Sequence, residues 1–67
     1  MLTGVDNVDW RELIGKRVLL GSHSSGRIYE VRIREVSPTG RFAKVCSSYD
    51  CYWIETGKYE ILEVLDK

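Results

Sequence analysis

The chain has 67 residues, of which 43% are hydrophobic and 30% are charged, and its ten basic residues balance ten acidic ones. This length fits a single domain with one small core, and the composition is that of a folded protein. The zero net charge argues against a strongly electrostatic nucleic-acid binder, while leaving room for a local basic patch. The longest apolar runs are only a few residues, so no segment is expected to cross a membrane.

The first residues are predicted to form an N-terminal arm over 1–9, followed by a domain over 10–67. They lack the basic start and apolar run of a secretory signal, so a cytoplasmic protein is expected. Asp9 and Glu12 have the spacing of a capping box, which predicts one short helical turn. Gly15 supplies a left-handed stop. A single turn is not stable alone, so its apolar side chains should pack on the domain.

From residue 16 onward the hydrophobic period is two, which is typical of β-strands. Five strands are predicted, over residues 17–20, 27–36, 41–46, 51–54 and 59–65. In the second strand Val36 is out of phase with Ile33, which predicts a bulge near Arg34 and Glu35. Pro38 and Gly40 then occupy the positions that a type I turn prefers.

The alternation within these strands predicts which side chains form the core. The expected inward side chains are Tyr29, Val31, Ile33, Ala43, Val45, Tyr52, Ile54, Tyr59, Ile61 and Leu65. Short strands joined by tight turns predict an all-β domain that curls into a small barrel, which removes exposed sheet edges.

Four segments resemble the SH3-like barrel group, which includes Tudor-type and KOW-type domains. They are the opening Leu-Ile-Gly-Lys-Arg-Val at 13–18, the loop 21–26, the bent strand ending at 36–40 and the closing strand 59–64. The resemblance implies a single five-stranded SH3-like barrel with one short N-terminal helical turn. Tudor-type relatives hold methylated lysine or arginine in an aromatic cage. Tyr49, Tyr52 and Trp53 lie close together in this sequence, but their spacing does not define a pocket.

Catalysis is not expected from this chain. Its only histidine, His23, lies in a loop of serines and glycines with no orienting acid beside it. The chain contains no glycine-rich phosphate loop and no paired-histidine metal motif. We therefore expect a non-enzymatic protein with no cofactor, no metal and no small-molecule substrate.

Cys46 and Cys51 flank a four-residue turn and should face each other across a hairpin. Opposite residues have Cβ atoms about 4.5–5.5 Å apart, only slightly beyond the usual disulfide range, so a bridge can form. Zinc needs more ligands than two thiolates, and such a site would require a second subunit. Reduced thiols are the first expectation for a cytoplasmic protein, and the disulfide is a close second.

The outer face of the second, third and fourth strands is the predicted binding surface. Its candidate residues are Arg32, Arg34, Arg41, Phe42, Lys44 and Trp53. Pairing Cys46 with Cys51 places Lys44 opposite Trp53, where a cation–π contact can form. Aromatic rings beside cations are typical of single-strand nucleic-acid binders. A charged, solvated sheet face explains most of the same residues without a ligand.

The fifth strand indicates a different partner. Leu62 and Val64 are predicted to lie on the face opposite the core, where they need a cover. The N-terminal arm, a second copy of the chain or another protein could supply it. We therefore predict a module that binds another protein or itself, with DNA or RNA binding through the Arg/Lys/aromatic face as the alternative.

Overall fold

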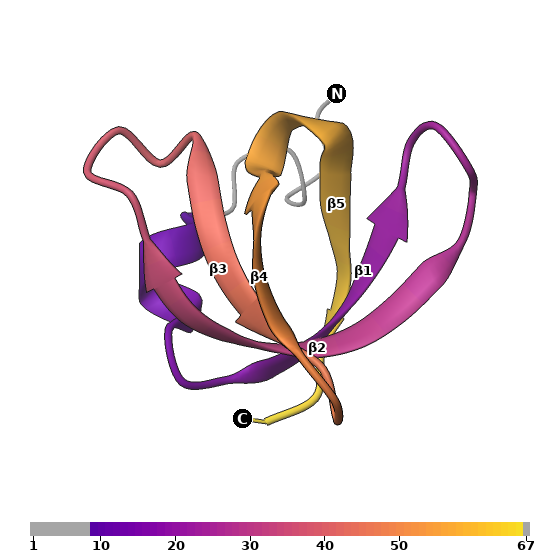
Figure 1. Ribbon diagram of the computed structural model, residues 1–67, viewed down its shortest axis with the longest axis horizontal. Helices are drawn as coiled ribbons and strands as arrows, with labels where there is room; N and C mark the ends of the chain where they lie inside the picture. The colour runs from indigo at the N-terminus through magenta and orange to yellow at the C-terminus, as the bar shows by residue number, and fades with distance from the viewer. Residues whose placement is uncertain (1–8, 67) are drawn as a thin grey trace.

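The computed structural model describes residues 9–66 and has one curled antiparallel sheet (Figure 1). In chain order the elements are η2 (Trp10–Leu13), β1 (Arg17–Ser22), β2 (Ile28–Val36), β3 (Phe42–Cys46), β4 (Cys51–Glu55), η3 (Thr56–Lys58) and β5 (Tyr59–Val64). The all-β prediction is confirmed, and each strand lies within two residues of its predicted range. The predicted arm 1–9 lies outside the described residues except for Asp9. Within residues 9–66 no helix has the length and hydrophobicity to span a bilayer.

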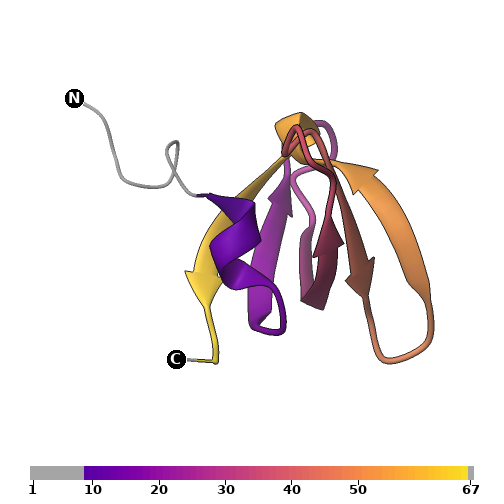
Figure 2. The same ribbon diagram turned by 90° about the vertical axis from the view of Figure 1, so that its left-hand side faces the viewer.

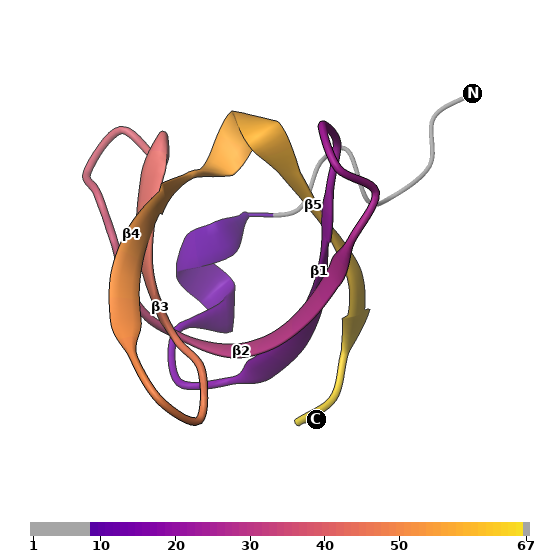
Figure 3. The ribbon, with the colours of Figure 1, turned by 45° about the vertical axis from the view of Figure 1, so that its right-hand side comes forward.

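The strands are hydrogen-bonded in the order β4-β3-β2-β1-β5, with every neighbouring pair antiparallel. β2 is long enough to pair with β1 through its first half and with β3 through its second half. It curves between these two pairings and wraps the sheet around the core (Figure 3). β4 and β5 remain the two edges, at opposite margins in Figure 2. The sheet is therefore curled but not closed into the predicted barrel.

The predicted bulge and turn around the end of β2 are both present. The register between β2 and β3 shifts between Ile33 and Glu35, which leaves Arg34 as the extra residue. This shift returns Val36 to the core side of the sheet. The Gly40 N–H donates to the Ser37 carbonyl oxygen at 2.9 Å, and Gly40 has a φ of 78°, a conformation that glycine adopts without strain.

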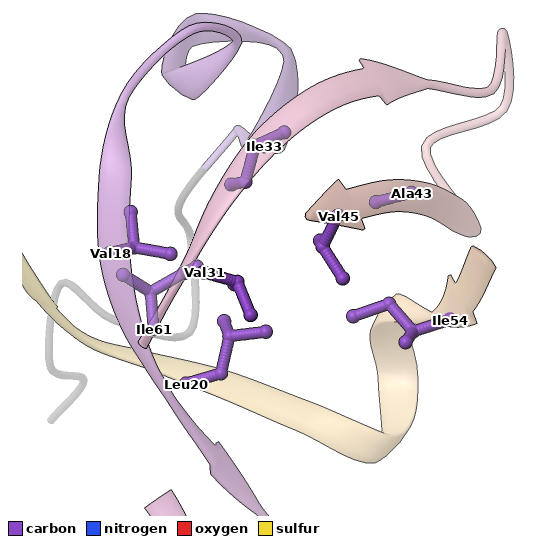
Figure 4. Packing of buried hydrophobic residues seen from close by; sticks show 8 residues of the cluster. All are labelled: Val18, Leu20, Val31, Ile33, Ala43, Val45, Ile54 and Ile61. Carbon is purple, nitrogen blue, oxygen red and sulfur yellow. The ribbon is translucent and has the colours of Figure 1, made fainter. Parts of the chain in front are cut away.

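The core lies inside the curl and is formed by aliphatic side chains from all five strands (Figure 4). Its buried members are Val18, Leu20, Val31, Ile33, Ala43, Val45, Ile54 and Ile61. Trp10 and Leu13 of η2 pack against this cluster, as expected for a helical turn that needs support. The Asp9 side chain caps η2 by accepting a hydrogen bond from the Arg11 N–H at 3.0 Å.

The prediction for β5 was wrong at Val64. The register pairs Leu20 with Ile61 but Leu19 with Glu63, so Leu62 is an extra residue in a second bulge. The bulge reverses the alternation beyond it. Val64 therefore packs against the core.

Leu62 remains on the outer face, as predicted. It lies over Gly21, where an added Cβ would approach the Leu62 Cδ1 to 3.1 Å. Leu65, predicted to be inward, follows the end of β5 and is only half-buried. The apolar pair predicted to need a cover is thus reduced to one side chain.

Candidate functional site

Most of the predicted binding residues share the outer face of the sheet. The register pairs Arg32 with Cys46 and Lys44 with both Glu35 and Trp53, so the predicted Lys44–Trp53 pairing is confirmed. Phe42 lies on the same face at the other end of β3, and Arg41 directly precedes it. Arg41 and Cys46 are five positions apart along an extended chain, which is about 16 Å. The predicted surface is therefore a long strip rather than a compact site.

Two of the arginines on this face are already bound to carboxylates. Asp66 is 3.3 Å from the Arg17 Nε and 3.1 Å from an Arg32 guanidinium nitrogen. Arg17 also pairs with Glu30 at 3.1 Å, and Arg32 donates to the Gly15 carbonyl oxygen at 2.6 Å. Much of the positive charge at this end of the strip is thus neutralised within the domain.

The pKa of Asp66 reflects these contacts. Desolvation acts to raise the pKa of its carboxyl group, but hydrogen bonds from Arg17 and attraction by Arg17 and Arg32 outweigh that effect. The pKa therefore lies below its ordinary value of 3.8. A carboxylate held in its charged form keeps both arginines in place across the pH range of most cells.

Arg34 differs from these two arginines because it has no ion pair within residues 9–66. It borders a hollow of about 380 Å³ lined by Arg17, Glu30, Val31, Arg32, Arg34, Cys46, Ser47 and Ser48. A smaller hollow of about 160 Å³ is lined by Arg34, Glu35, Lys44, Cys46 and Cys51. The sequence did not indicate Ser47 and Ser48 as neighbours of Arg34, because their position depends on the pairing of β3 with β2, in which Cys46 lies opposite Arg32.

Cys46 and Cys51 form a disulfide bond across the β3–β4 hairpin. The structure thus has the second of the two expected states rather than the reduced thiols. Both sulfur atoms are used in the bridge, so neither is a thiolate ligand for a metal. The bridge lies on the outer face, where Cys51 is exposed, and it ties the first residue of β4 to β3.

The aromatic side chains of the third and fourth strands do not gather into a cage. Tyr49 is 92% exposed in the turn, and Trp53 is 52% exposed on the outer face. Tyr52 pairs with the buried residue Val45, and paired residues share a face, so its ring points to the opposite side from Trp53. Tyr52 and Trp53 therefore lie on opposite faces of the sheet, and Tyr49 lies outside the sheet in the turn.

Tyr52 instead shares the inner face of the sheet with two other tyrosines near strand starts, and we call the three residues the tyrosine cluster: Tyr29, Tyr52 and Tyr59. The rings of Tyr29 and Tyr59 meet edge to face, with centroids 6.4 Å apart and planes at 65°. Tyr29 is 36% exposed and Tyr52 is 41% exposed. The cluster joins β2, β4 and β5, and two of these strands are the edges of the sheet.

The surroundings of Tyr52 raise the pKa of its hydroxyl. Burial raises the pKa of its hydroxyl above 10.0, and the nearby phenols of Tyr59 and Tyr29 and the carboxylate of Asp50 raise it further. Within residues 9–66 none of the three hydroxyls forms a hydrogen bond to a protein group. The cluster therefore offers aromatic faces and free hydroxyls beside a carboxylate.

The sequence predicted the correct face for these tyrosines but not their common position at the rim of the core. Tyr29 and Tyr52 are each the second residue of a strand, and Tyr59 is the first residue of its strand. Inward residues at strand ends lie at the rim of a small core, where a long side chain extends into solvent. The sequence does show that all three tyrosines stand at strand starts. Which strand starts are neighbours in space follows only from the strand order.

His23 lies 3.9 Å from Glu60 on an exposed loop. The neighbouring serines bond within the same loop: the Ser22 Oγ lies 3.3 Å from the Ser24 Oγ, and it also accepts from the Ser25 N–H at 3.3 Å. These hydroxyls shape the loop, and none of them is hydrogen-bonded to the imidazole.

Charge is unevenly distributed along the chain although its sum is zero. Residues 9–49 carry eight basic and four acidic side chains, whereas residues 50–66 carry five acidic side chains and one lysine. The first segment contains β1, β2 and β3, and the second contains β4 and β5. The two sheet edges thus belong to an acidic segment, and the central strands belong to a basic one.

Comparison of the chain with protein-family models, curated proteins and solved structures finds no match. Relatives therefore do not distinguish between the outer face and the tyrosine cluster. The choice depends on the chemistry of the two surfaces.

Proposed function

We propose that this domain is a non-enzymatic protein-binding module, and that the tyrosine cluster is its contact surface. The observation that supports this proposal is the shared inner-face position of three tyrosines from three strands, whose hydroxyls have no protein partner within residues 9–66. Tyrosine is enriched in protein interfaces because its ring supplies a large contact area with few rotatable bonds. Tyr29 and Tyr59 hold each other edge to face, which limits the ordering needed on binding.

The charge around the cluster favours a basic partner. Asp50 lies near Tyr52, and residues 50–66 are strongly acidic. A lysine or arginine side chain placed over a tyrosine ring gains a cation–π attraction. It would gain a further attraction from the carboxylates nearby.

The same proposal includes the fold family and the location. A strand order with β1 between β2 and β5 supports membership of the SH3-like barrel group, in which closure would occur between β4 and β5. The cytoplasm is the proposed location. The Cys46–Cys51 bridge is the feature that bears against it, since such bonds persist in oxidising compartments.

A library of random peptides displayed on phage tests the binding function. Selected peptides should bind the wild-type domain at least about tenfold more tightly than the Tyr52→Ala or Tyr29→Ala variants, as expected for an aromatic hot spot. Tyr49→Ala is the matched control, because that ring is 92% exposed in a turn, and it should leave the affinity unchanged. Far-ultraviolet circular dichroism verifies that each variant is folded. Selected peptides that bind Tyr52→Ala as tightly as wild type would refute the proposal.

Single-stranded nucleic-acid binding by the outer face is the second candidate function. It is supported by Arg34, which borders two hollows without an ion pair within residues 9–66, and by the exposed Trp53 ring. The engagement of Arg17 and Arg32 with carboxylates weakens it. Fluorescence anisotropy of a labelled mixed-sequence oligonucleotide at low salt is the test. Arg34→Ala should lower its affinity while Arg27→Ala, in the β1–β2 loop, should not. Absence of binding at low salt, where phosphate attraction is strongest, would end this candidate.

A further inference from the structure

β4 is an edge strand along its whole length. It ends the hydrogen-bonded order, with β3 on one side and no strand from residues 9–66 on the other. Its register with β3 is unbroken from Cys51 to Glu55, whereas the other edge strand, β5, contains the bulge at Leu62. A regular strand with a free edge can pair with another extended chain.

Two hydrogen bonds establish which residues of β4 bond to β3. The Ser47 N–H donates to the Asp50 carbonyl oxygen at 2.8 Å, and the Thr56 N–H donates to the Arg41 carbonyl oxygen at 2.8 Å. Hydrogen-bonded pairs alternate with non-bonded pairs in an antiparallel ladder. Every second residue of β4, beginning with Tyr52, therefore bonds to β3.

The intervening residues of β4 direct their backbone N–H and C=O groups away from β3, toward the free side: Cys51, Trp53 and Glu55. Natural edge strands are commonly protected by lysine, proline or a bulge, and β4 has none of these features. The disulfide holds the first residue of the strand to β3. The unpaired edge is therefore both regular and anchored.

The charge at this edge distinguishes between occupants. Asp50 precedes β4 and Glu55 ends it, within a segment of five acidic side chains and one lysine. Two copies joined edge to edge through β4 would bring like charges together, which is destabilising. A basic strand would be attracted instead.

We propose that the β4 edge binds an extended, lysine- or arginine-bearing peptide of a partner protein as an additional strand. This inference rests on the protein-binding function proposed above and specifies how its partner is held. Paired residues share a face of the sheet, so the peptide residue opposite Tyr52 would place its side chain beside the tyrosine cluster. The backbone bonds would supply affinity, and the basic side chain over the rings would supply specificity.

Residue-resolved amide exchange by NMR tests the site of binding. The probe is a peptide of alternating lysine and valine with blocked ends, and its glutamate–valine counterpart is the charge control. The lysine peptide should slow exchange at the Cys51, Trp53 and Glu55 amides by at least about tenfold, the factor expected for one added hydrogen bond. The amides of Tyr59 and Ile61 on β5 should be unchanged. The glutamate peptide should bind at least about tenfold more weakly.

Backbone methylation of the same probe tests the binding mode. In an added strand only alternate peptide amides point to the neighbouring strand. N-methylation of one alternate set, the lysines or the valines, should therefore weaken binding at least about tenfold, whereas N-methylation of the other set should not. Equal loss with both sets, or no loss with either, would overturn strand addition.

The two proposals fail in different ways. Binding that is insensitive to N-methylation but lost in Tyr52→Ala would leave the tyrosine cluster as the contact surface and remove strand addition. Binding that follows the methylation pattern but survives Tyr52→Ala would remove the proposed role of the cluster. Slow exchange at Trp53 and Glu55 without peptide would also overturn the inference. If it depends on concentration, a second copy covers the edge; otherwise the chain's own residues cover it.

Discussion

The outer face of β2 and β3 and the tyrosine cluster use their polar groups in opposite ways. On the outer face, Arg17 and Arg32 are held by Asp66 and Glu30. In the tyrosine cluster, the hydroxyls have no protein partner within residues 9–66, and the aromatic faces reach solvent. The more highly charged surface is thus the more satisfied one. The difference shows that a charged surface can be largely paired within the domain and so offer few free groups to a ligand.

The largest expected change is a loss of stability on substitution in β2, the strand that contributes residues to both surfaces. Ile33 is fully buried on β2, between Arg32 and Arg34 of the outer face. Ile33→Ala should destabilise the domain by about 3 kcal/mol, because it removes buried methyl groups and leaves a cavity. Urea unfolding followed by tryptophan fluorescence measures the loss.

The matched control is Ile28→Ala on the same strand, where the side chain is 62% exposed. It should change the unfolding free energy by no more than about 0.5 kcal/mol. If both substitutions lowered the free energy of unfolding equally, burial of Ile33 would not be what stabilises β2.

Removal of the disulfide should destabilise β4, which carries Tyr52, more than the rest of the sheet. Replacing both Cys46 and Cys51 by serine should lower the unfolding free energy by about 2 kcal/mol, because the bridge closes only a short loop. Amide exchange should accelerate in β4, which carries Tyr52, more than in β1 and β5. A chemical reductant should reproduce both effects in the wild type. An unfolding midpoint that ignores reductant would contradict a stabilising bridge.

A smaller effect is expected for Asp66→Asn, which releases Arg17 and Arg32. Exposed ion pairs add little to stability, so the change should appear mainly in pH dependence. Because the pKa of Asp66 is lowered in the folded state, its contribution is present above the ordinary value of 3.8 and is lost as pH falls through the folded value. As pH falls through this acid range, the urea midpoint of unfolding should fall less in Asp66→Asn than in the wild type. Identical acid profiles would show that the carboxylate is not a clamp.

The smallest effect is expected for Tyr52→Phe at alkaline pH. Burial and the neighbouring phenols raise the pKa of Tyr52 above 10.0 in the folded state, so the unfolded chain releases this proton first. The free energy of unfolding should therefore fall as pH rises above 10.0. It should fall less in Tyr52→Phe than in the wild type, because the variant lacks this titrating hydroxyl. Tyr49→Phe, in the exposed turn, should show the wild-type fall. The measurement is the unfolding midpoint as a function of pH.

The features that were predictable from the sequence depend on neighbours along the chain. Alternation located the five strands, and the phase break at Val36 located the bulge at Arg34. The short turn after Cys46 established its pairing with Cys51. Each of these is a local pattern, expressed within one strand or one hairpin.

The features that were missed depend on contacts between distant segments. The bulge at Leu62 becomes visible only when β5 is aligned against β1, because its sequence fits either phase of alternation. The tyrosine cluster depends on the strand order, because its members come from β2, β4 and β5. The state of Cys46 and Cys51 is a separate case: the two residues are neighbours in one hairpin whose geometry permits the bond, but the redox state is not written in the sequence.

The disulfide at the start of β4 has a thermodynamic consequence if a peptide binds that edge. A ligand that prefers the bridged form stabilises it relative to the dithiol form, and such coupling is reciprocal. Binding would therefore make the bond harder to reduce, and reduction would weaken binding by the same factor. The fraction of domains with peptide bound at this edge would then depend on the redox potential of the surroundings, with more binding under oxidising conditions than under reducing ones.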